Sequence, residues 1–278
     1  MKIGIFTNHN KDGKLTFSQE IVSIIEKNGA EAILFTDDNK SGVTIDFLFQ
    51  NSDVLVVLGG DGTILRLSKI AARLNLPILG INLGRVGFLS EVENNDLENA
   101  FKKLISGRYT IEERAMLNVR YKDKSFLALN ETMLGRFSQK IVNTELYIDD
   151  KFFYSYYADG LIVSTPTGST AYSLSSGGPI LCPGVDGMVV TAVCPHSLYN
   201  RPIVVAGFQK IKLRVAKNSP KSVLMVDGEY KVELEQNDEV YVEKSDICAK
   251  FIRLSEYNFF SRLVGKLNKW SLRAEDNE

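Results

Sequence analysis

Histidine and cysteine are scarce in this chain of 278 residues. It has two histidines, His9 and His196, and three cysteines, Cys182, Cys194 and Cys248. The cysteines are odd in number and far apart, and they lack the short spacings of zinc ligands. This scarcity argues against a structural zinc site and a disulfide framework, and it favours reduced thiols in a cytoplasmic protein. We expect His196 to be structural.

An excess of one charge sign and long apolar runs are also missing. The 33 Lys and Arg residues nearly balance the 34 Asp and Glu residues, which argues against a general electrostatic attraction to nucleic acid or an anionic membrane. No apolar run approaches the length of a transmembrane helix, and the apolar start, Met1–Phe6, is too short for a signal peptide. We therefore expect a soluble cytoplasmic protein without nucleic acid or membrane partners, in which any anion-binding site is local.

The pattern of expected elements changes near residue 109. Up to that point strand-like and helical segments alternate, which predicts a Rossmann-like parallel α/β domain over residues 1–108. Residues 109–255 consist mostly of short segments of alternating polarity, which predicts an antiparallel β-sandwich-like domain. Phe259–Trp270 is apolar enough to form a docked helix, so we expect residues 256–278 to return to the first domain. In the second domain, the pattern predicts separate strands over Asp238–Val242 and Cys248–Leu254.

The most informative stretch begins with Val54–Leu58, an unbroken apolar run of the kind found in parallel strands covered on both faces. Gly59-Gly60-Asp61-Gly62-Thr63 follows, and its glycines allow a sharp turn and the close approach of a ligand. We expect Thr63 to be the N-cap of the next helix, whose free N–H groups would favour phosphate. The alternative is an ordinary strand–turn–helix corner, which the rarity of the full string disfavours.

Asp61 is the odd member of this phosphate-binding pattern, because a carboxylate repels phosphate unless it binds a metal ion or removes a proton. A second loop, Asn82–Leu89, follows the expected strand Ile78–Ile81 and therefore reaches the same ligand-binding edge of the sheet. Arg85 in this loop could pair with a phosphate or be solvated at the surface.

Two polar stretches stand out in the second domain. Asn130-Glu131 falls inside an expected strand, Phe126–Phe137, so either one of the pair faces the core or both lie at a strand end or bulge. Asn can bind an adenine edge, and Glu can accept hydrogen bonds from two ribose hydroxyls. Residues 159–179 run from an expected strand into a loop rich in glycine and hydroxyl groups, where Tyr172 offers a face on which a base could stack.

Together these stretches resemble the NAD kinase family, and the resemblance covers nearly the whole chain. It rests on Gly59–Thr63, Gly84–Leu89, Asn130-Glu131 and Asp159–Ser175. The first motif also resembles strings in diacylglycerol kinases, sphingosine kinases and phosphofructokinases, whereas Thr165–Tyr172 is specific for NAD kinases. The resemblance implies transfer of the terminal phosphate of ATP, or of polyphosphate, to the 2′-hydroxyl of the adenosine ribose of NAD, which gives NADP. It also implies a divalent metal ion, with Mg²⁺ preferred.

The resemblance assigns roles to particular residues. Asp61 is the expected general base and also contacts NAD, as does Gly62. The β domain is expected to supply further NAD-binding residues: Asn130, Glu131, Asp159, Thr167, Thr170, Ala171, Tyr172, Ser173, Leu174, Ser175 and Cys194. The ATP phosphates are expected to contact Gly59, Gly60, Gly62, Thr63, Arg66 and Arg85. The metal ion would be bound through these phosphates, with Asp61 as a candidate ligand.

Family members usually form homodimers or homotetramers through the β domain, so Asp159 is a candidate to serve a neighbouring subunit's pocket. Many have a basic residue where this chain has Tyr157, which puts a cationic contact to the diphosphate in doubt.

Two alternatives to an NAD kinase stay open. A lipid kinase of the diacylglycerol kinase type shares the Asp61 turn but gives Asn130-Glu131 no role, and a non-catalytic dinucleotide sensor is disfavoured by the intact Asp61.

Overall fold

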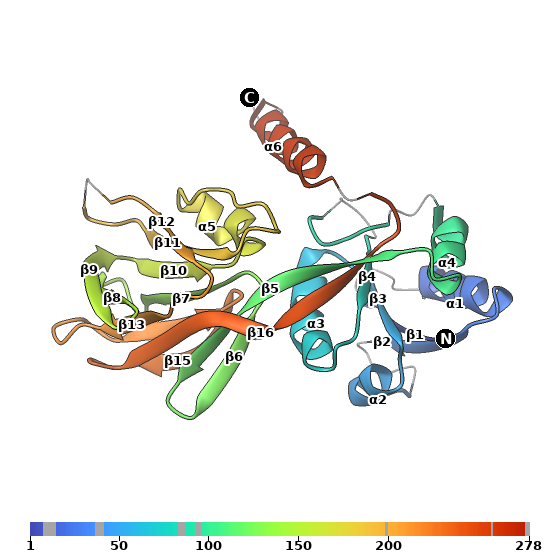
Figure 1. Cartoon of the computed structure of the whole chain (residues 1–278), viewed down its shortest axis with the longest axis horizontal. Helices are drawn as coiled ribbons and strands as arrows, with labels where there is room; N and C mark the ends of the chain where they lie inside the picture. The colour runs from blue at the N-terminus through green and yellow to red at the C-terminus, as the bar shows by residue number, and fades with distance from the viewer. Residues whose placement is uncertain are drawn as a thin grey trace. The chain divides into compact units, whose positions relative to one another are not determined.

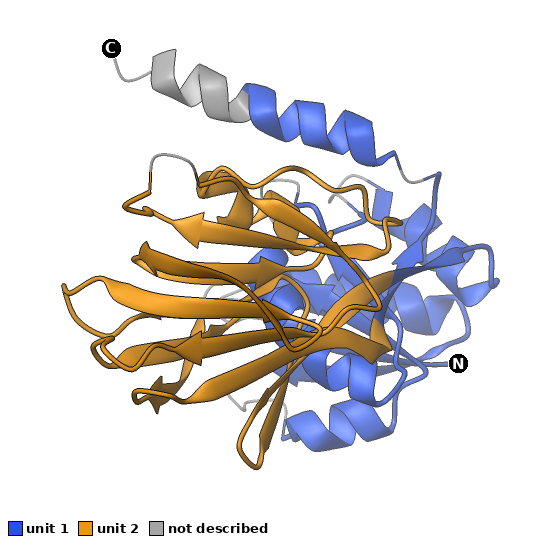
Figure 2. Ribbon diagram, turned by 60° about the vertical axis from the view of Figure 1, so that its left-hand side comes forward, with its two compact units in different colours: residues 1–113, 249–278 blue, residues 114–248 orange. Residues whose placement is uncertain are grey.

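A computed structural model describes residues 1–7, 15–36, 42–82, 87–92, 96–197, 200–256 and 258–275 (Figure 1). The chain forms two compact units, one of Met1–Glu113 with Ala249–Glu278 and the other of Arg114–Cys248 (Figure 2). Two long strands, β5 (Thr110–Tyr121) and β16 (Glu239–Arg253), include both unit boundaries. In the described part of the chain, no helix combines the length and apolarity needed to cross a membrane.

The first unit contains a parallel sheet with the strand order β2-β1-β3-β4. Its strands are β1 (Lys2–Thr7), β2 (Glu31–Thr36), β3 (Val54–Leu58) and β4 (Ile78–Ile81). Every residue of β3 is buried, as expected for a strand covered on both faces. Phe251, near the end of β16, pairs in parallel with Ile78 of β4. The predicted parallel α/β domain is confirmed.

Helices cover both faces of this sheet (Figure 1). They are α1 (Thr16–Lys27), α2 (Ile45–Gln50), α3 (Asp61–Arg73) and α4 (Leu97–Ile105), and the unit ends with α6 (Phe259–Glu275). Ile21 of α1 and Phe101 of α4 share one apolar cluster with Val56 of β3. The aromatic ring of Phe259 lies 6.4 Å from that of Phe88, so α6 returns to the first unit as predicted.

The second unit is a two-layer β structure with an apolar core. One antiparallel sheet has the order β12-β11-β10-β7-β14-β15, and the other layer follows β16-β13-β8-β9, with β5 paired to β16 and β6. The new strands are β6 (Lys124–Ala128), β7 (Glu131–Arg136), β8 (Val142–Ile148), β9 (Lys151–Ala158), β10 (Gly160–Ser164), β11 (Gly187–Val193), β12 (Ile203–Ala206), β13 (Ile211–Val215), β14 (Ser222–Val226) and β15 (Glu229–Leu234). Leu161 of β10 and Leu213 of β13, from different layers, meet in one core cluster. The predicted sandwich-like domain is confirmed.

Two strand predictions in this unit are wrong. The single strand expected over Phe126–Phe137 is two strands, β6 and β7, because the backbone at Leu129 and Asn130 leaves the ladder to bond with other segments. The two strands expected over Asp238–Val242 and Cys248–Leu254 are the single strand β16. The polar residues in the middle of β16 looked like a loop between two strands. They belong to one continuous strand, and their polarity reflects the exposure of several of their side chains.

Candidate active site

The glycine-rich turn joins β3 directly to α3. Gly60 is the N-cap, with extended backbone (φ −90°, ψ 178°), and its carbonyl accepts hydrogen bonds from Thr63 N at 3.0 Å and Ile64 N at 3.2 Å. The expectation that Thr63 caps the helix is therefore wrong, because the N-cap is Gly60, three residues earlier, and the helix begins at Asp61. This places the Asp61 carboxylate in the first helical turn, where the helix dipole stabilises negative charge.

Backbone groups of the 87–89 segment hold the Asp61 side chain. Phe88 N donates to Oδ2 at 2.8 Å, and Leu89 N donates to Oδ1 at 3.2 Å. Gly87 lies so close that a β-carbon there would be 1.7 Å from Oδ1. A residue with a side chain at position 87 would therefore displace the carboxylate.

A cation also contacts Asp61. The Nζ atom of Lys266, on α6, lies 3.2 Å from Asp61 Oδ2 and 3.9 Å from the centre of the Phe88 ring. This contact could not be predicted from sequence patterns, because 205 residues separate the two partners. The carboxylate nevertheless keeps 34% of its side-chain surface exposed, so it stays accessible to a substrate.

The other expected phosphate-binding residues differ in their surroundings. Gly59 is buried, whereas Gly62 is exposed. Apart from its two chain neighbours and the backbone of its own helix, no described atom lies within 4 Å of the place where a Gly62 β-carbon would be. Arg66 is exposed, and its guanidinium lies 5.5 Å from the centre of the Phe6 ring. Arg85 lies outside the described residues.

In the second unit, Asn130 and Glu131 occupy the break between β6 and β7. Asn130 stands in the connection and Glu131 begins β7, so both lie at a strand end, one of the two arrangements that the sequence allowed. The Thr165 backbone N–H donates to Asn130 O at 2.9 Å. A β-carbon on Gly168 would lie 2.0 Å from the same oxygen, so the hydroxyl-rich loop packs tightly against Asn130.

Asp227 fixes the same segment from another direction. Its carboxylate accepts hydrogen bonds from Leu129 N at 3.0 Å, Asn130 N at 2.8 Å and Glu131 N at 3.2 Å. Asp227 is 8% exposed and adopts a left-handed backbone conformation, with φ 49°. The sequence marked Asp227-Gly228 only as a turn. A carboxylate directly after the apolar strand β14 was the available signal that this Asp has buried partners.

The hydroxyl-rich loop forms a 3₁₀ turn over Gly168–Thr170 and a short helix, α5 (Tyr172–Ser175). Tyr172 is 45% exposed and therefore open to a stacking partner. The hydroxyls of Thr167 and Ser173 are bonded within the unit, Thr167 Oγ1 to Arg114 Nη1 at 3.3 Å and Ser173 Oγ to Thr191 Oγ1 at 3.0 Å. Among the remaining expected residues of the loop, Thr170, Ala171 and Leu174 are half-buried and Ser175 is exposed.

Asp159 and Cys194 lie at the other end of β10. Asp159 immediately precedes β10, and its backbone N–H donates to Val193 O at 2.9 Å, next to the exposed Cys194. Asp159 Oδ1 pairs with Arg136 Nη1 at 2.9 Å. A five-residue strand spans about 16 Å. Asp159 and Cys194 are therefore well separated from Asn130 and Glu131, which lie at the opposite end of β10.

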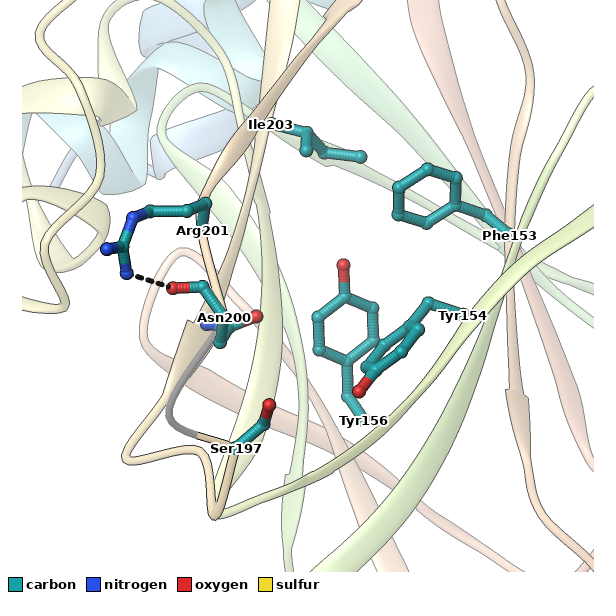
Figure 3. Close-up of a pocket in the computed structure, with 7 residues that line it drawn as sticks. All are labelled: Phe153, Tyr154, Tyr156, Ser197, Asn200, Arg201 and Ile203. Atoms are coloured by element: carbon teal, nitrogen blue, oxygen red, sulfur yellow. Dashed lines mark hydrogen bonds between the residues drawn. The ribbon is translucent and has the colours of Figure 1, made fainter.

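A pocket of about 280 Å³ opens beside β9 (Figure 3). Aromatic side chains of β9 line one side, and residues from the start of β12 and the segment before it line the other: Phe153, Tyr154, Tyr156, Ser197, Asn200, Arg201 and Ile203. The Arg201 guanidinium is engaged with the Asn200 carbonyl at 3.0 Å. None of the expected NAD-binding or ATP-binding residues lines this pocket.

Both units match models of one protein family. Residues 3–109 match the ATP-NAD kinase N-terminal domain, and residues 129–254 match the ATP-NAD kinase C-terminal domain. The chain belongs to the NAD kinase family. This membership makes it a phosphotransferase and confirms the resemblance found in the sequence.

Individual NAD kinases match along almost their whole length. The chain is 40% identical to an NAD kinase of Acetivibrio thermocellus, covering 96% of this chain and 97% of that protein. It is 37% identical to an NAD kinase of Caldanaerobacter subterraneus subsp. tengcongensis, covering 96% and 99%.

Solved structures agree with this assignment. Yeast NADH kinase complexed with NADH matches with a TM-score of 0.80 and 26% identity, over 97% of this chain and 88% of that one. An NAD kinase from Archaeoglobus fulgidus in complex with ATP matches with a TM-score of 0.78 and 27% identity, over 96% and 99%. The two-domain fold is therefore shared with these NAD kinases.

Proposed function

We propose that this chain transfers the terminal phosphate of ATP to the 2′-hydroxyl of the adenosine ribose of NAD, with Asp61 as the general base. The observation that carries this proposal is the placement of Asp61. Its carboxylate sits in the first turn of α3, is held by two backbone N–H groups and stays partly exposed. A positioned carboxylate is what a ribose hydroxyl, a poor nucleophile, needs in order to react.

The reaction would begin as the hydroxyl proton moves to Asp61. The 2′-oxygen then bonds to the γ-phosphorus, while the bond from that phosphorus to the β–γ bridging oxygen breaks and ADP leaves. The exposed position of Gly62 supports this role, because no described side chain beyond its two chain neighbours lies within 4 Å of the place where its β-carbon would be.

Recognition of the adenosine is assigned to the second unit. Asp227 and Thr165 hold the backbone of Asn130 and Glu131, so these side chains would present their polar ends to adenine and ribose without a large loss of conformational entropy. Tyr172 would stack on the base. The Thr167 and Ser173 hydroxyls bond to Arg114 and Thr191, and since a hydroxyl can donate one hydrogen bond and accept two, each keeps capacity for a further contact to the ligand.

A divalent ion, Mg²⁺ by preference, would be carried by the phosphates of ATP. Within the described residues no group of three or more His, Cys, Asp or Glu side chains could hold a metal ion by itself. A single carboxylate, Asp61, is therefore the candidate protein ligand. This fits an ion bound through the nucleotide, because Mg²⁺ commonly binds substrate phosphates with only one or two carboxylates. When bound, the ion would neutralise charge on the transferring phosphate.

We further propose a homo-oligomer assembled through the β domain. The path of paired strands ends at β9, where Phe152 is 58% and Tyr157 60% exposed, and exposed aromatic side chains on an outer strand are typical of an interface. Asp159 and Cys194 lie too far along β10 to join the Asn130 group on one adenosine, and in a homo-oligomer Asp159 would serve a neighbour's pocket. Light scattering should report a dimer or tetramer, and a monomer at assay concentrations would refute this assembly.

The test is to incubate the purified protein with NAD, ATP and Mg²⁺ and to measure NADP with an NADP-specific dehydrogenase. Asp61→Asn should lose most turnover and still bind NAD. Asp46→Asn is a matched control, because Asp46 also occupies the first turn of a helix in the same unit, and it should behave like the wild type. Polyphosphate in place of ATP tests the donor.

Three results would contradict the proposal. Wild-type turnover in the Asp61→Asn variant would remove Asp61 from the base role. Bound NAD with no NADP above the blank would favour a dinucleotide sensor. Phosphorylation of diacylglycerol in place of NAD would favour a lipid kinase.

A further inference from the structure

We propose that Lys266 is a positioning residue that holds the Asp61 carboxylate in place and provides a positive charge beside it during phosphoryl transfer. This inference rests on the proposed role of Asp61 as the base. Its starting point is the ion pair between Lys266 Nζ and Asp61 Oδ2 at 3.2 Å, in which 21% of the Lys266 side chain is exposed.

The described residues bring three donors to Asp61, from two directions. Phe88 N and Leu89 N bind one oxygen each from the 87–89 segment, and the Lys266 ammonium adds a second donor on Oδ2 from α6. An ionised carboxylate offers about four acceptor positions, so about one stays available for the hydroxyl proton. The donors thereby specify which lone pair faces the substrate.

Lys266 is itself held in place by contacts along α6. Its ammonium lies 3.9 Å from the centre of the Phe88 ring, which is within cation–π range. One turn earlier on the helix, Arg262 pairs with the buried Glu91 at 3.2 Å. The start of α6 adds the Phe259 ring packed beside Phe88. The helix is therefore fixed to the segment that also holds Asp61.

The ammonium also has a chemical use. Before the reaction, Lys266 neutralises the carboxylate. When Asp61 takes the proton of the 2′-hydroxyl, its negative charge disappears, while negative charge remains on the transferring phosphate. Lys266 then loses its anionic partner beside the reacting groups, where it can stabilise that charge. A neutral side chain can do neither.

The experiment compares Lys266→Gln and Lys266→Arg with the wild type in the NADP assay. We expect Lys266→Gln to lower kcat by about 10- to 100-fold, the cost of misplacing a reacting group, with KM for NAD within about twofold. Lys266→Arg should recover part of this loss, because it keeps the positive charge. Lys102→Gln is the matched control, since Lys102 is an exposed lysine of the same unit paired only to Glu98 among the described contacts, and it should leave kcat unchanged.

A second measurement needs no turnover. The urea midpoints of Asp61→Asn, Lys266→Gln and the double variant form a cycle that reports the contact itself. We expect the midpoint shift of the double variant to differ from the sum of the two single shifts, because either single substitution already breaks the ion pair. Additive shifts would show that the ion pair is absent in solution.

The outcomes separate the two proposals. If the wild type makes NADP, Asp61→Asn does not, and Lys266→Gln keeps wild-type kcat, the positioning role is refuted and the base survives. Equal losses in Lys266→Gln and Lys266→Arg, or a rise in KM with unchanged kcat, would also overturn it. If Asp61→Asn retains full turnover, the proposed function fails first, and the inference with it.

Discussion

Removing the Asp227 carboxylate should both destabilise the second unit and weaken NAD binding. One oxygen, Oδ1, accepts from Asn130 N and Glu131 N, and the other, Oδ2, accepts from Leu129 N. Asp227→Asn keeps one carbonyl oxygen but turns an NH₂ group toward a backbone donor. A hydrogen bond to a charged group contributes about 1.5–3 kcal/mol, so we expect this variant to lose about 2 kcal/mol of unfolding free energy.

Asp227→Ala should cost more, for two reasons. It leaves three backbone N–H groups without their acceptor, two of them buried, and each buried donor left unsatisfied costs about 1–3 kcal/mol. The backbone at position 227 has φ 49°, a conformation that Asn tolerates but that costs Ala about 1 kcal/mol. The expected order of stability is therefore wild type, then Asp227→Asn, then Asp227→Ala.

Urea denaturation and equilibrium binding of NAD measure the two consequences. Asp246→Asn is the control, because Asp246 is exposed on β16 of the same unit, and it should change stability by no more than about 0.5 kcal/mol. In Asp227→Asn the loosened Asn130-Glu131 segment should raise the Kd for NAD several-fold. If Asp227→Asn is as stable as Asp246→Asn and binds NAD like the wild type, the carboxylate does not organise this segment.

Two further predictions follow from other sites. Gly62→Ala should keep or raise stability by up to about 1 kcal/mol in urea denaturation, since Ala favours a helix and the space is open, yet it should lower kcat/KM for NAD; unchanged kcat/KM would show that no ligand approaches there. Burial is the largest single influence on the pKa of Asp238 and raises it. Hydrogen bonds from a backbone N–H and two side chains together outweigh burial, so the pKa lies below its ordinary value of 3.8. A lowered pKa adds stability above the unfolded value that is lost as the pH falls through the folded value, so Asp238→Asn should be destabilised at pH 7, and its urea midpoint should approach that of the wild type at pH 3; a pH-independent difference would contradict this assignment.

Sequence patterns predicted the bounds of an element correctly where the residues of that element alone determine its structure. Val54–Leu58 and Ile78–Ile81 are strands with the predicted bounds, because their burial on both faces leaves unbroken apolar runs. The start of α3 was misplaced because Thr is a common N-cap, whereas the extended backbone of Gly60 lets its carbonyl accept the first helical bonds.

Contacts between distant segments could not be found in this way. Asp227 bonds to a segment almost a hundred residues earlier, and Lys266 reaches Asp61 across 205 residues. The position of Asp227 directly after an apolar strand hints at buried partners but does not say which ones, and a helical Lys such as Lys266 is common on any surface. Distant contacts also explain why the expected strand Phe126–Phe137 is two strands. The first strand ends where the backbone forms hydrogen bonds with Asp227 and Thr165.

The glycines of the motifs show how a requirement of the fold can be separated from a requirement of the ligand. A β-carbon on Gly87 or Gly168 would overlap protein atoms, at 1.7 Å from Asp61 Oδ1 and 2.0 Å from Asn130 O. The protein itself therefore demands glycine at both positions, and these two residues say nothing directly about a substrate. Gly62 has open space and a place in the first helical turn, where alanine would be the more stabilising residue. A glycine that the fold does not need, next to a carboxylate that it holds in place, is best explained by a ligand that must reach that carboxylate.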